Sequence, residues 1–242
     1  MDYLKEFTTK LENLDRSKNI ATVFKDFLTL CTCALAQPFY RSDKLEQIYL
    51  DTVKTYTKEQ ANEFSQMLAL LVSALENEFQ DFLGKVYMSL KIGSSANGQF
   101  FTPYCVSKMM SEINFIEVEE KLKANDFISL SDPCCGSSGM IIAFAETMKN
   151  NNYNYQKQLF VEVIDIDEMC FMMSYIQLSL YGIPARVMLG DSLAWKIQRV
   201  LYTPFYFLSG IRYRLEQAEK EESKQIKHVE FDMQLKLFDY IE

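Results

Sequence analysis

The stretch Asp132-Pro133-Cys134-Cys135-Gly136-Ser137-Ser138-Gly139 decides how this sequence is interpreted. It follows a short β-prone run over 127–131 and precedes an apolar segment over 140–148 that has helical character. In α/β proteins, a strand, a tight glycine turn and a helix start bring backbone N–H groups close to a ligand. The stretch therefore predicts a nucleotide-type binding turn, although plain surface turns can also be rich in Gly and Ser.

Two further strands are expected downstream, and each ends in an acid. Residues 158–165 have the character of a strand that ends at Asp165, a helix follows over 169–181, and 185–191 form a third strand that ends at Asp191. This alternation implies right-handed crossovers and a parallel sheet. Ligands bind beyond the carboxyl ends of such strands, so Asp132, Asp165 and Asp191 are expected at one site, although any one of them alone could cap a helix.

Residues 1–92 are expected to be helical. Apolar residues recur every three or four positions from Ile20 to Leu35, which places Cys31 on the buried side, and Gln37-Pro38 is expected to end this helix. Thr57 begins a capping box for a second amphipathic helix. Both apolar faces are expected to pack within the domain, and the alternative is a partner-binding helix.

A composition change over 91–98, rich in small and polar residues, predicts a loop between the two parts. Thr102 is expected to cap a helix that begins at Pro103. The aromatics before it, Phe100 and Phe101, could form a hydrophobic staple on the helix entry or a wall for a flat or thioether ligand.

Composition limits the class of protein. The chain has 242 residues, of which 48% are hydrophobic, so a real core is expected. No run approaches the ~18 apolar residues of a membrane span, and the N-terminus lacks the order of a signal peptide, so a cytoplasmic protein without a membrane partner is expected. Six cysteines without a CxxC pair and a single histidine leave little for a metal site. A net charge of −8 disfavours strong DNA binding by the chain alone.

The ordered segments 81–87, 98–103, 132–139, Asp165 and 190–193 together resemble the motifs of the γ-type adenine-N6 DNA methyltransferases, above all the modification subunits of type I restriction systems. The resemblance implies an α/β, Rossmann-like methyltransferase sheet with S-adenosylmethionine as cofactor. It also implies the following cofactor-binding residues: Phe100, Phe101, Thr102 and Pro103 near the methionine end, Asp132, Pro133, Gly136 and Gly139 at the turn, Asp165 on the ribose and Asp191 on the adenine.

The sequence departs from this family at two places. The turn ends in Ser138-Gly139 where the family usually has two glycines, so a side chain is expected on the side where backbone and ligand approach. The catalytic segment, Asn/Asp/Ser-Pro-Pro-aromatic, which holds the amino group of a flipped-out adenine, is absent from the sequence. The nearest remnant, and the weak candidate for a catalytic site, is Thr203-Pro204-Phe205.

We therefore expect a helical region over 1–92, a cofactor-binding domain over 93–200 with a shortened sheet, and a short extension over 201–242 whose segment 228–238 alternates like a strand. The favoured function is a protein that binds S-adenosylmethionine and is inactive in DNA methylation by itself. One alternative is an active enzyme with an atypical acceptor site or a motif supplied by a second protein chain. The other is a non-catalytic module of a restriction-modification or anti-restriction assembly.

Overall fold

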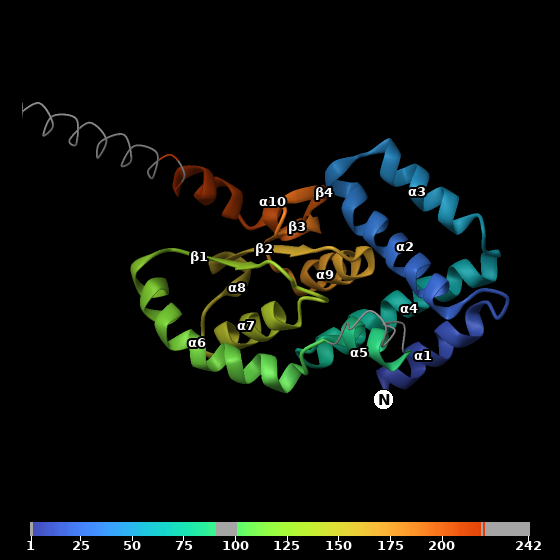
Figure 1. Cartoon of the computed structure of the whole chain (residues 1–242), viewed down its shortest axis with the longest axis horizontal. Helices are drawn as coiled ribbons and strands as arrows, with labels where there is room; N and C mark the ends of the chain where they lie inside the picture. The colour runs from blue at the N-terminus through green and yellow to red at the C-terminus, as the bar shows by residue number, and fades with distance from the viewer. Residues whose placement is uncertain (1, 91–100, 219, 221–242) are drawn as a thin grey trace, which may run out of the picture.

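The structure, a computed structural model, describes residues 2–90, 101–218 and 220 (Figure 1). Helices α1 to α5 form the N-terminal part, and a helix-covered sheet follows. The helical part comprises α1 (Tyr3–Leu14), α2 (Ile20–Tyr40), α3 (Asp43–Val53), α4 (Lys58–Asn77) and α5 (Phe82–Ser89). The second part comprises α6 (Tyr104–Ala124), β1 (Ile128–Asp132), α7 (Gly139–Asn150), α8 (Tyr155–Gln158), β2 (Leu159–Asp165), α9 (Glu168–Tyr181), β3 (Ala185–Asp191), β4 (Lys196–Tyr202) and α10 (Pro204–Leu208).

Within the described residues, the sheet has four strands in the order β1-β2-β3-β4. The first three strands are parallel, with Leu130 opposite Val161 and Val163 opposite Val187. Strand β4 returns antiparallel to β3. The predicted α/β fold with a helical N-terminal region and a short sheet is confirmed, whereas β4 was not predicted because it buries little besides Leu201 and so lacks a clear apolar pattern.

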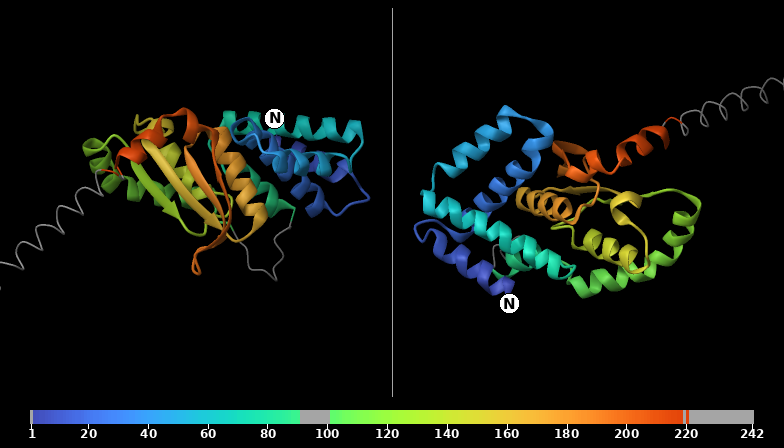
Figure 2. Two further views of the ribbon diagram at one scale, coloured as in Figure 1. Left: turned by 90° about the horizontal axis from the view of Figure 1, so that it is seen from above. Right: turned by 180° about the vertical axis from the view of Figure 1, so that it is seen from behind.

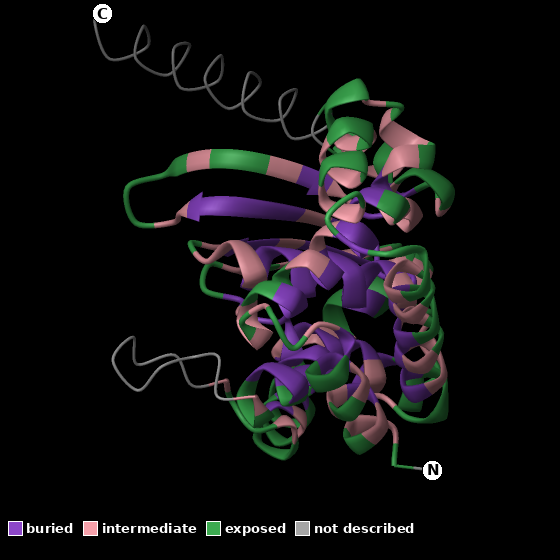
Figure 3. Cartoon of the chain, turned by 90° about the vertical axis from the view of Figure 1, so that its right-hand side faces the viewer, coloured by how far each residue is buried: buried purple, intermediate pink, exposed green. Residues whose placement is uncertain are grey.

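Helices cover both faces of this sheet. Helices α7 and α9, which connect the parallel strands, lie on one side in Figure 1, and α10 lies on the other. Helix α6 packs along α7 and reaches β1, while α2 of the helical part packs against α9. The buried residues form one continuous core that runs from the helical part into the sheet (Figure 3).

Aromatic side chains make the centre of the helical part. The Phe7 ring lies edge-on to Phe27 and Phe82, with centroids 5.2 and 5.4 Å away. Two local predictions are confirmed here, since Cys31 is buried and the capping box at Thr57 has both of its hydrogen bonds. Among the described residues α2 is the one helix that is long and apolar enough to cross a membrane, and half of that window is buried inside the protein, as a core helix would be.

Two predicted helix boundaries are wrong. Helix α2 continues through Pro38 and ends at Arg41, which adopts a left-handed conformation and donates its N–H to Gln37 O. A proline in the last turn removes only one helical hydrogen bond, so the helix tolerates it. Helix α6 begins at Tyr104 rather than Pro103, because Pro103 has ψ 136 at the N-cap position, and no side chain caps the helix. The expected loop over 91–98, Phe100 and the segment 228–238 lie outside the described residues.

Candidate functional site

The turn after β1 is tied to the end of β2 by backbone groups. Cys135 N–H donates to Ile164 O at 3.0 Å, and Gly136 N–H donates to Asp165 Oδ2 at 2.8 Å. Asp167 N–H donates to the other oxygen, Oδ1, of the Asp165 carboxylate at 2.9 Å. Because a carboxylate offers about four lone-pair sites, Asp165 keeps capacity for a ligand hydroxyl while it orders the turn.

Both the backbone conformation and the available space require glycine at position 136. Its φ is +56°, which disfavours other residues, and a Cβ there would lie 3.0 Å from the Phe101 ring. The Phe101 ring in turn lies 5.2 Å from the Tyr87 ring of α5. Phe101 therefore covers the turn, and its role as a wall for a ligand stays a prediction.

Ser138, where the family usually has glycine, is directed away from the ligand side. It is fully buried with φ 68°, a conformation that costs a non-glycine residue about 1–2 kcal/mol. Its hydroxyl is in hydrogen-bond contact with the Ser174 hydroxyl on α9. Contrary to the expectation, this side chain does not line the cavity beside the turn, because its hydroxyl is turned toward Ser174 of α9.

A cavity of about 90 Å³ opens beside the turn. It brings together five residues of the predicted site with six others, and the lining is Asp81, Phe101, Thr102, Ser107, Asp132, Cys134, Cys135, Gly136, Ser137, Gly139 and Met140. The Ser107 hydroxyl is completely buried and has no hydrogen-bond partner among the described residues. A buried hydroxyl without a partner is costly, so it indicates a polar ligand group in this cavity. The cavity alone is smaller than the ~300 Å³ typical of small-molecule sites, so it suits one end of a ligand.

The carboxylates that end β1 and β2, Asp132 and Asp165, share an unusual environment. Burial raises the pKa of Asp132, and the hydrogen bond from Cys134 N–H (3.1 Å) opposes this rise only in part. Burial likewise raises the pKa of Asp165, against the lowering effect of the two backbone amides that it accepts. Raised carboxyl pKa values at a strand edge are typical of sites that are completed by a ligand or a counter-charge.

The remaining predicted residues lie around this centre. Asp191 ends β3 at the same sheet edge, and its Oδ1 accepts from Leu193 and Ala194 N–H at 2.9 Å. Pro103 and Pro133 are exposed. Sequence reasoning missed Ile166, which directly follows Asp165 and is 68% exposed, although an apolar residue after a strand-end acid was a visible signal.

Asp81 was named only as part of a helical segment, yet its carboxylate supports the turn. It accepts from Ser137 Oγ at 2.5 Å, from Gln177 Nε2 at 2.9 Å and from Gly84 N–H at 2.9 Å, where it caps α5. Gln177 Oε1 accepts from Leu83 N–H at 3.0 Å. Residues from α5, the turn and α9 therefore meet in one buried network, which no local sequence pattern could reveal.

The structure does not bring Thr203-Pro204-Phe205 to this site. The buried Thr203 hydroxyl donates to Ile183 O at 2.7 Å and accepts from Ala185 N–H at 2.9 Å. Ala185 begins β3, whereas Asp191 ends it, so the segment lies roughly 20 Å from the carboxyl edge at about 3.3 Å per residue. Pro204 begins the short helix α10. In the described part of the chain, no cluster of His, Cys, Asp and Glu could hold a metal ion.

Comparison with known proteins identifies the family. Residues 79–224, more than half of the chain, match the family model for N-6 DNA Methylase. The chain belongs to the N-6 DNA methylase family. A comparison with curated proteins gives no match. A protein from Listeria monocytogenes assigned as a class I S-adenosylmethionine-dependent methyltransferase is similar in structure, with 13% identity and a TM-score of 0.45 over 79% of this chain and 54% of that one.

Membership of this N-6 DNA methylase family implies S-adenosylmethionine as the cofactor. The residues at the carboxyl edge fit such a ligand, since the Ser107 hydroxyl, which has no hydrogen-bond partner among the described residues, lines the cavity beside the glycine turn, and the exposed Ile166 directly follows Asp165. A carboxylate at the end of the second strand suits ribose hydroxyls, and an exposed aliphatic side chain suits the face of a flat base. The sulfonium group would supply the methyl group for transfer.

Proposed function

We propose that this N-6 DNA methylase family member binds S-adenosylmethionine and serves adenine methylation without transferring the methyl group by itself. In this proposal a second protein chain supplies the segment that holds the target adenine. The supporting observation is the separation of roughly 20 Å between the Thr203 segment and the Asp191 end of β3. A hydroxyl that already makes two backbone hydrogen bonds has little capacity to hold an adenine amino group.

Transfer to an exocyclic amine requires an orienting group, and positioning can account for about 7–11 kcal/mol of a barrier. Nothing among the described residues at the carboxyl edge takes the role of an Asn/Asp-Pro-Pro-aromatic segment. The net charge of −8 also argues for a partner that recruits DNA. The function is therefore one of cofactor presentation within an assembly.

The first experiment measures cofactor binding by calorimetric titration of the full chain with S-adenosylmethionine. Asp165→Ala should weaken binding by about 1–3 kcal/mol, the cost of leaving hydroxyls and amides without a charged acceptor. Asp126→Ala, at an exposed position before β1, is the matched control and should bind like the wild type. Absence of binding at millimolar ligand would favour the non-catalytic interaction module instead.

The second experiment measures transfer of tritiated methyl groups to adenine in duplex DNA with saturating cofactor. We expect no transfer by the chain alone, and transfer on addition of a second chain that carries the adenine-holding segment. Robust transfer by the isolated chain, abolished by Thr203→Val or Phe205→Leu, would refute the proposal and assign these residues to a working acceptor site.

A further inference from the structure

A cavity of about 250 Å³ lies where the helical part meets strand β4 of the sheet, and we call it the α2–β4 cavity. Its walls come from α2, the beginning of α3, the first turns of α9, and β4. Tyr202 N–H donates to the Tyr40 hydroxyl at 2.5 Å, and the right-hand view of Figure 2 shows the end of α2 beside β4. None of its lining residues lines the cavity beside the glycine turn, so the two sites are separate.

Thr32 of α2 lines the α2–β4 cavity and leaves a polar group there without a partner. The residue is 5% exposed, and its hydroxyl makes no hydrogen bond with any described residue. Thr29, which lines the same cavity, satisfies its hydroxyl in the way usual for a helix, by donating to Lys25 O at 2.9 Å. A buried hydroxyl without a partner is costly, so Thr32 indicates a polar ligand atom in the buried part of the cavity.

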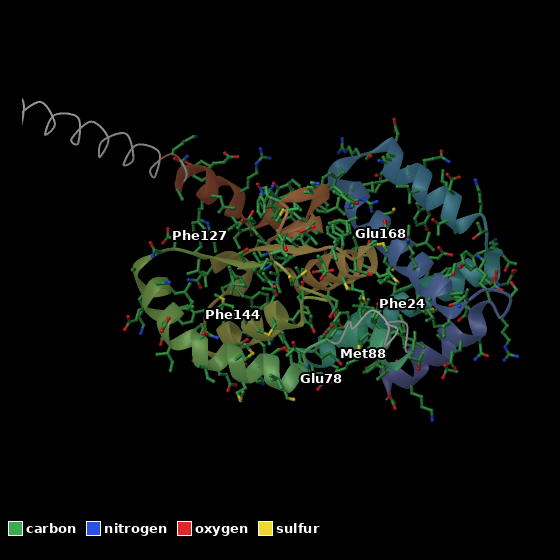
Figure 4. All side chains as sticks on the ribbon, viewed as in Figure 1. Phe24, Glu78, Met88, Phe127, Phe144 and Glu168 are labelled. Atoms are coloured by element: carbon green, nitrogen blue, oxygen red, sulfur yellow. The ribbon has the colours of Figure 1, made fainter. Side chains whose placement is uncertain are left out.

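Two cationic side chains, Lys44 of α3 and Arg199 of β4, also line this cavity, and both are exposed. The Arg199 guanidinium donates to Glu168 Oε1 at 3.1 Å. The other carboxylate oxygen of Glu168, which Figure 4 labels at the start of α9, pairs with Lys25 Nζ of α2 at 2.7 Å. Lys44 makes no ion pair with a described residue, and the acids in the first turn of α3 line a neighbouring cavity instead. The exposed end of the α2–β4 cavity therefore carries an excess of positive charge and suits an anion.

The remaining wall is largely apolar and sets the size of the ligand. Met172 and Leu201 are buried in it, and Leu45, Ile48 and Val200 are partly exposed. A cavity of about 150 Å³ with apolar walls holds benzene, so a cavity of about 250 Å³ holds roughly ten non-hydrogen atoms. Apolar walls with a few placed polar groups are typical of small-molecule sites.

We propose that the α2–β4 cavity binds a short aliphatic carboxylate that carries an oxygen atom at its far end. The carboxylate pairs with Arg199 and Lys44, the methylene chain lies against the apolar wall, and the terminal oxygen forms a hydrogen bond with the Thr32 hydroxyl. A ligand held in this way joins α3, none of whose residues is buried, to β4. The proposal does not depend on the binding of S-adenosylmethionine.

Calorimetric titration of the full chain with two matched acids tests the contact with Thr32. 7-Hydroxyheptanoate and octanoate both have the size of about ten non-hydrogen atoms that the cavity holds, and they differ in a terminal hydroxyl or methyl group. Thr32→Val removes the unpartnered hydroxyl, and Thr29→Val, at a hydroxyl that already has an acceptor, is the matched control. We expect the preference for the hydroxy acid over octanoate to fall at least about ten-fold in Thr32→Val and to stay unchanged in Thr29→Val. An equal preference in all three proteins, or no binding of either acid at millimolar concentration, would overturn the proposal.

The neutral analogue 7-hydroxyheptanamide tests the role of the positive charge. The wild type should bind the amide at least about ten-fold more weakly than the acid, and Arg199→Gln should reduce this difference. Arg186→Gln is the matched control, because Arg186 pairs with Glu162 of the adjacent strand at 2.9 Å and does not line the cavity. Equal affinity of the wild type for acid and amide would contradict an anion site.

Thermal unfolding without ligand separates a binding role of Thr32 from a structural one. Thr32→Val should unfold at a temperature no lower than the wild type, because the variant loses a buried hydroxyl that has no partner. A clearly lower unfolding temperature would show that the hydroxyl is satisfied within the protein, and would remove the reason for placing a ligand oxygen beside it.

Discussion

Replacement of Asp81 by alanine should destabilise the whole protein and not only α5. The side chain is 5% exposed and its carboxylate accepts from Gly84 N–H, Ser137 Oγ and Gln177 Nε2. Loss of an N-cap costs about 1 kcal/mol, and each buried donor that loses a charged partner costs about 1–3 kcal/mol. Gln177 Nε2 keeps a second acceptor, Ser137 O at 2.9 Å, so we expect a total loss of about 3–5 kcal/mol.

Urea denaturation of the full chain measures this loss. Asp81→Asn is the matched variant, because it retains an oxygen for Gly84 N–H and an amide that the Ser137 hydroxyl can accept from, and it should lose about 1–2 kcal/mol. A double-mutant cycle with Ser137→Ala should give a coupling free energy of about 1–3 kcal/mol. A loss below about 1 kcal/mol for Asp81→Ala, or a coupling near zero, would refute the reasoning that this carboxylate supports the turn.

Three further outcomes are expected. Burial raises the pKa of Asp132, so between about pH 4 and that raised pKa the folded state binds more protons than the unfolded state, and the free energy of unfolding should fall as pH rises through this range. Asp132→Asn should therefore be more stable than wild type at pH 7 and equal to it below about pH 4, as measured by urea denaturation. Ser174→Ala should destabilise by about 1–3 kcal/mol because it leaves the buried Ser138 hydroxyl without its partner, whereas the double variant with Ser138→Gly should recover most of this loss in thermal unfolding. Thr203→Val should lower the free energy of unfolding by about 1–3 kcal/mol and leave the affinity for S-adenosylmethionine, measured by calorimetry, unchanged. A loss of affinity would argue against a purely structural role for Thr203.

The parts of the fold that follow local rules could be predicted from the sequence. Strand β3 was expected over its observed bounds, Ala185–Asp191, since its apolar run, its acid and the preceding Gly182 are all local signals. The capping box at Thr57 is equally local. Helix α3 was not predicted as a separate helix, because none of its residues is buried and its apolar periodicity is therefore weak.

The site was predictable where residues lie on one strand end, and not where it depends on distant contacts. Asp132, Gly136 and Asp165 meet as expected because parallel strands bring their carboxyl ends to one edge. The orientation of Ser138 could not be predicted, because it depends on Ser174 in another helix. Ser107 gave no signal either, since an isolated serine within a helix is ordinarily unremarkable.

The hydrogen-bond network around Asp81 also bears on the order in which the structural elements form during folding. Asp81 meets Gln177 across 96 positions in the chain and Ser137 across 56. Contacts of such long sequence separation form late in folding, because closure of the intervening chain has an entropic cost before any contact stabilises it. We therefore expect a nascent chain to form its helices and the β3–β4 hairpin first, and the ability to bind the cofactor last.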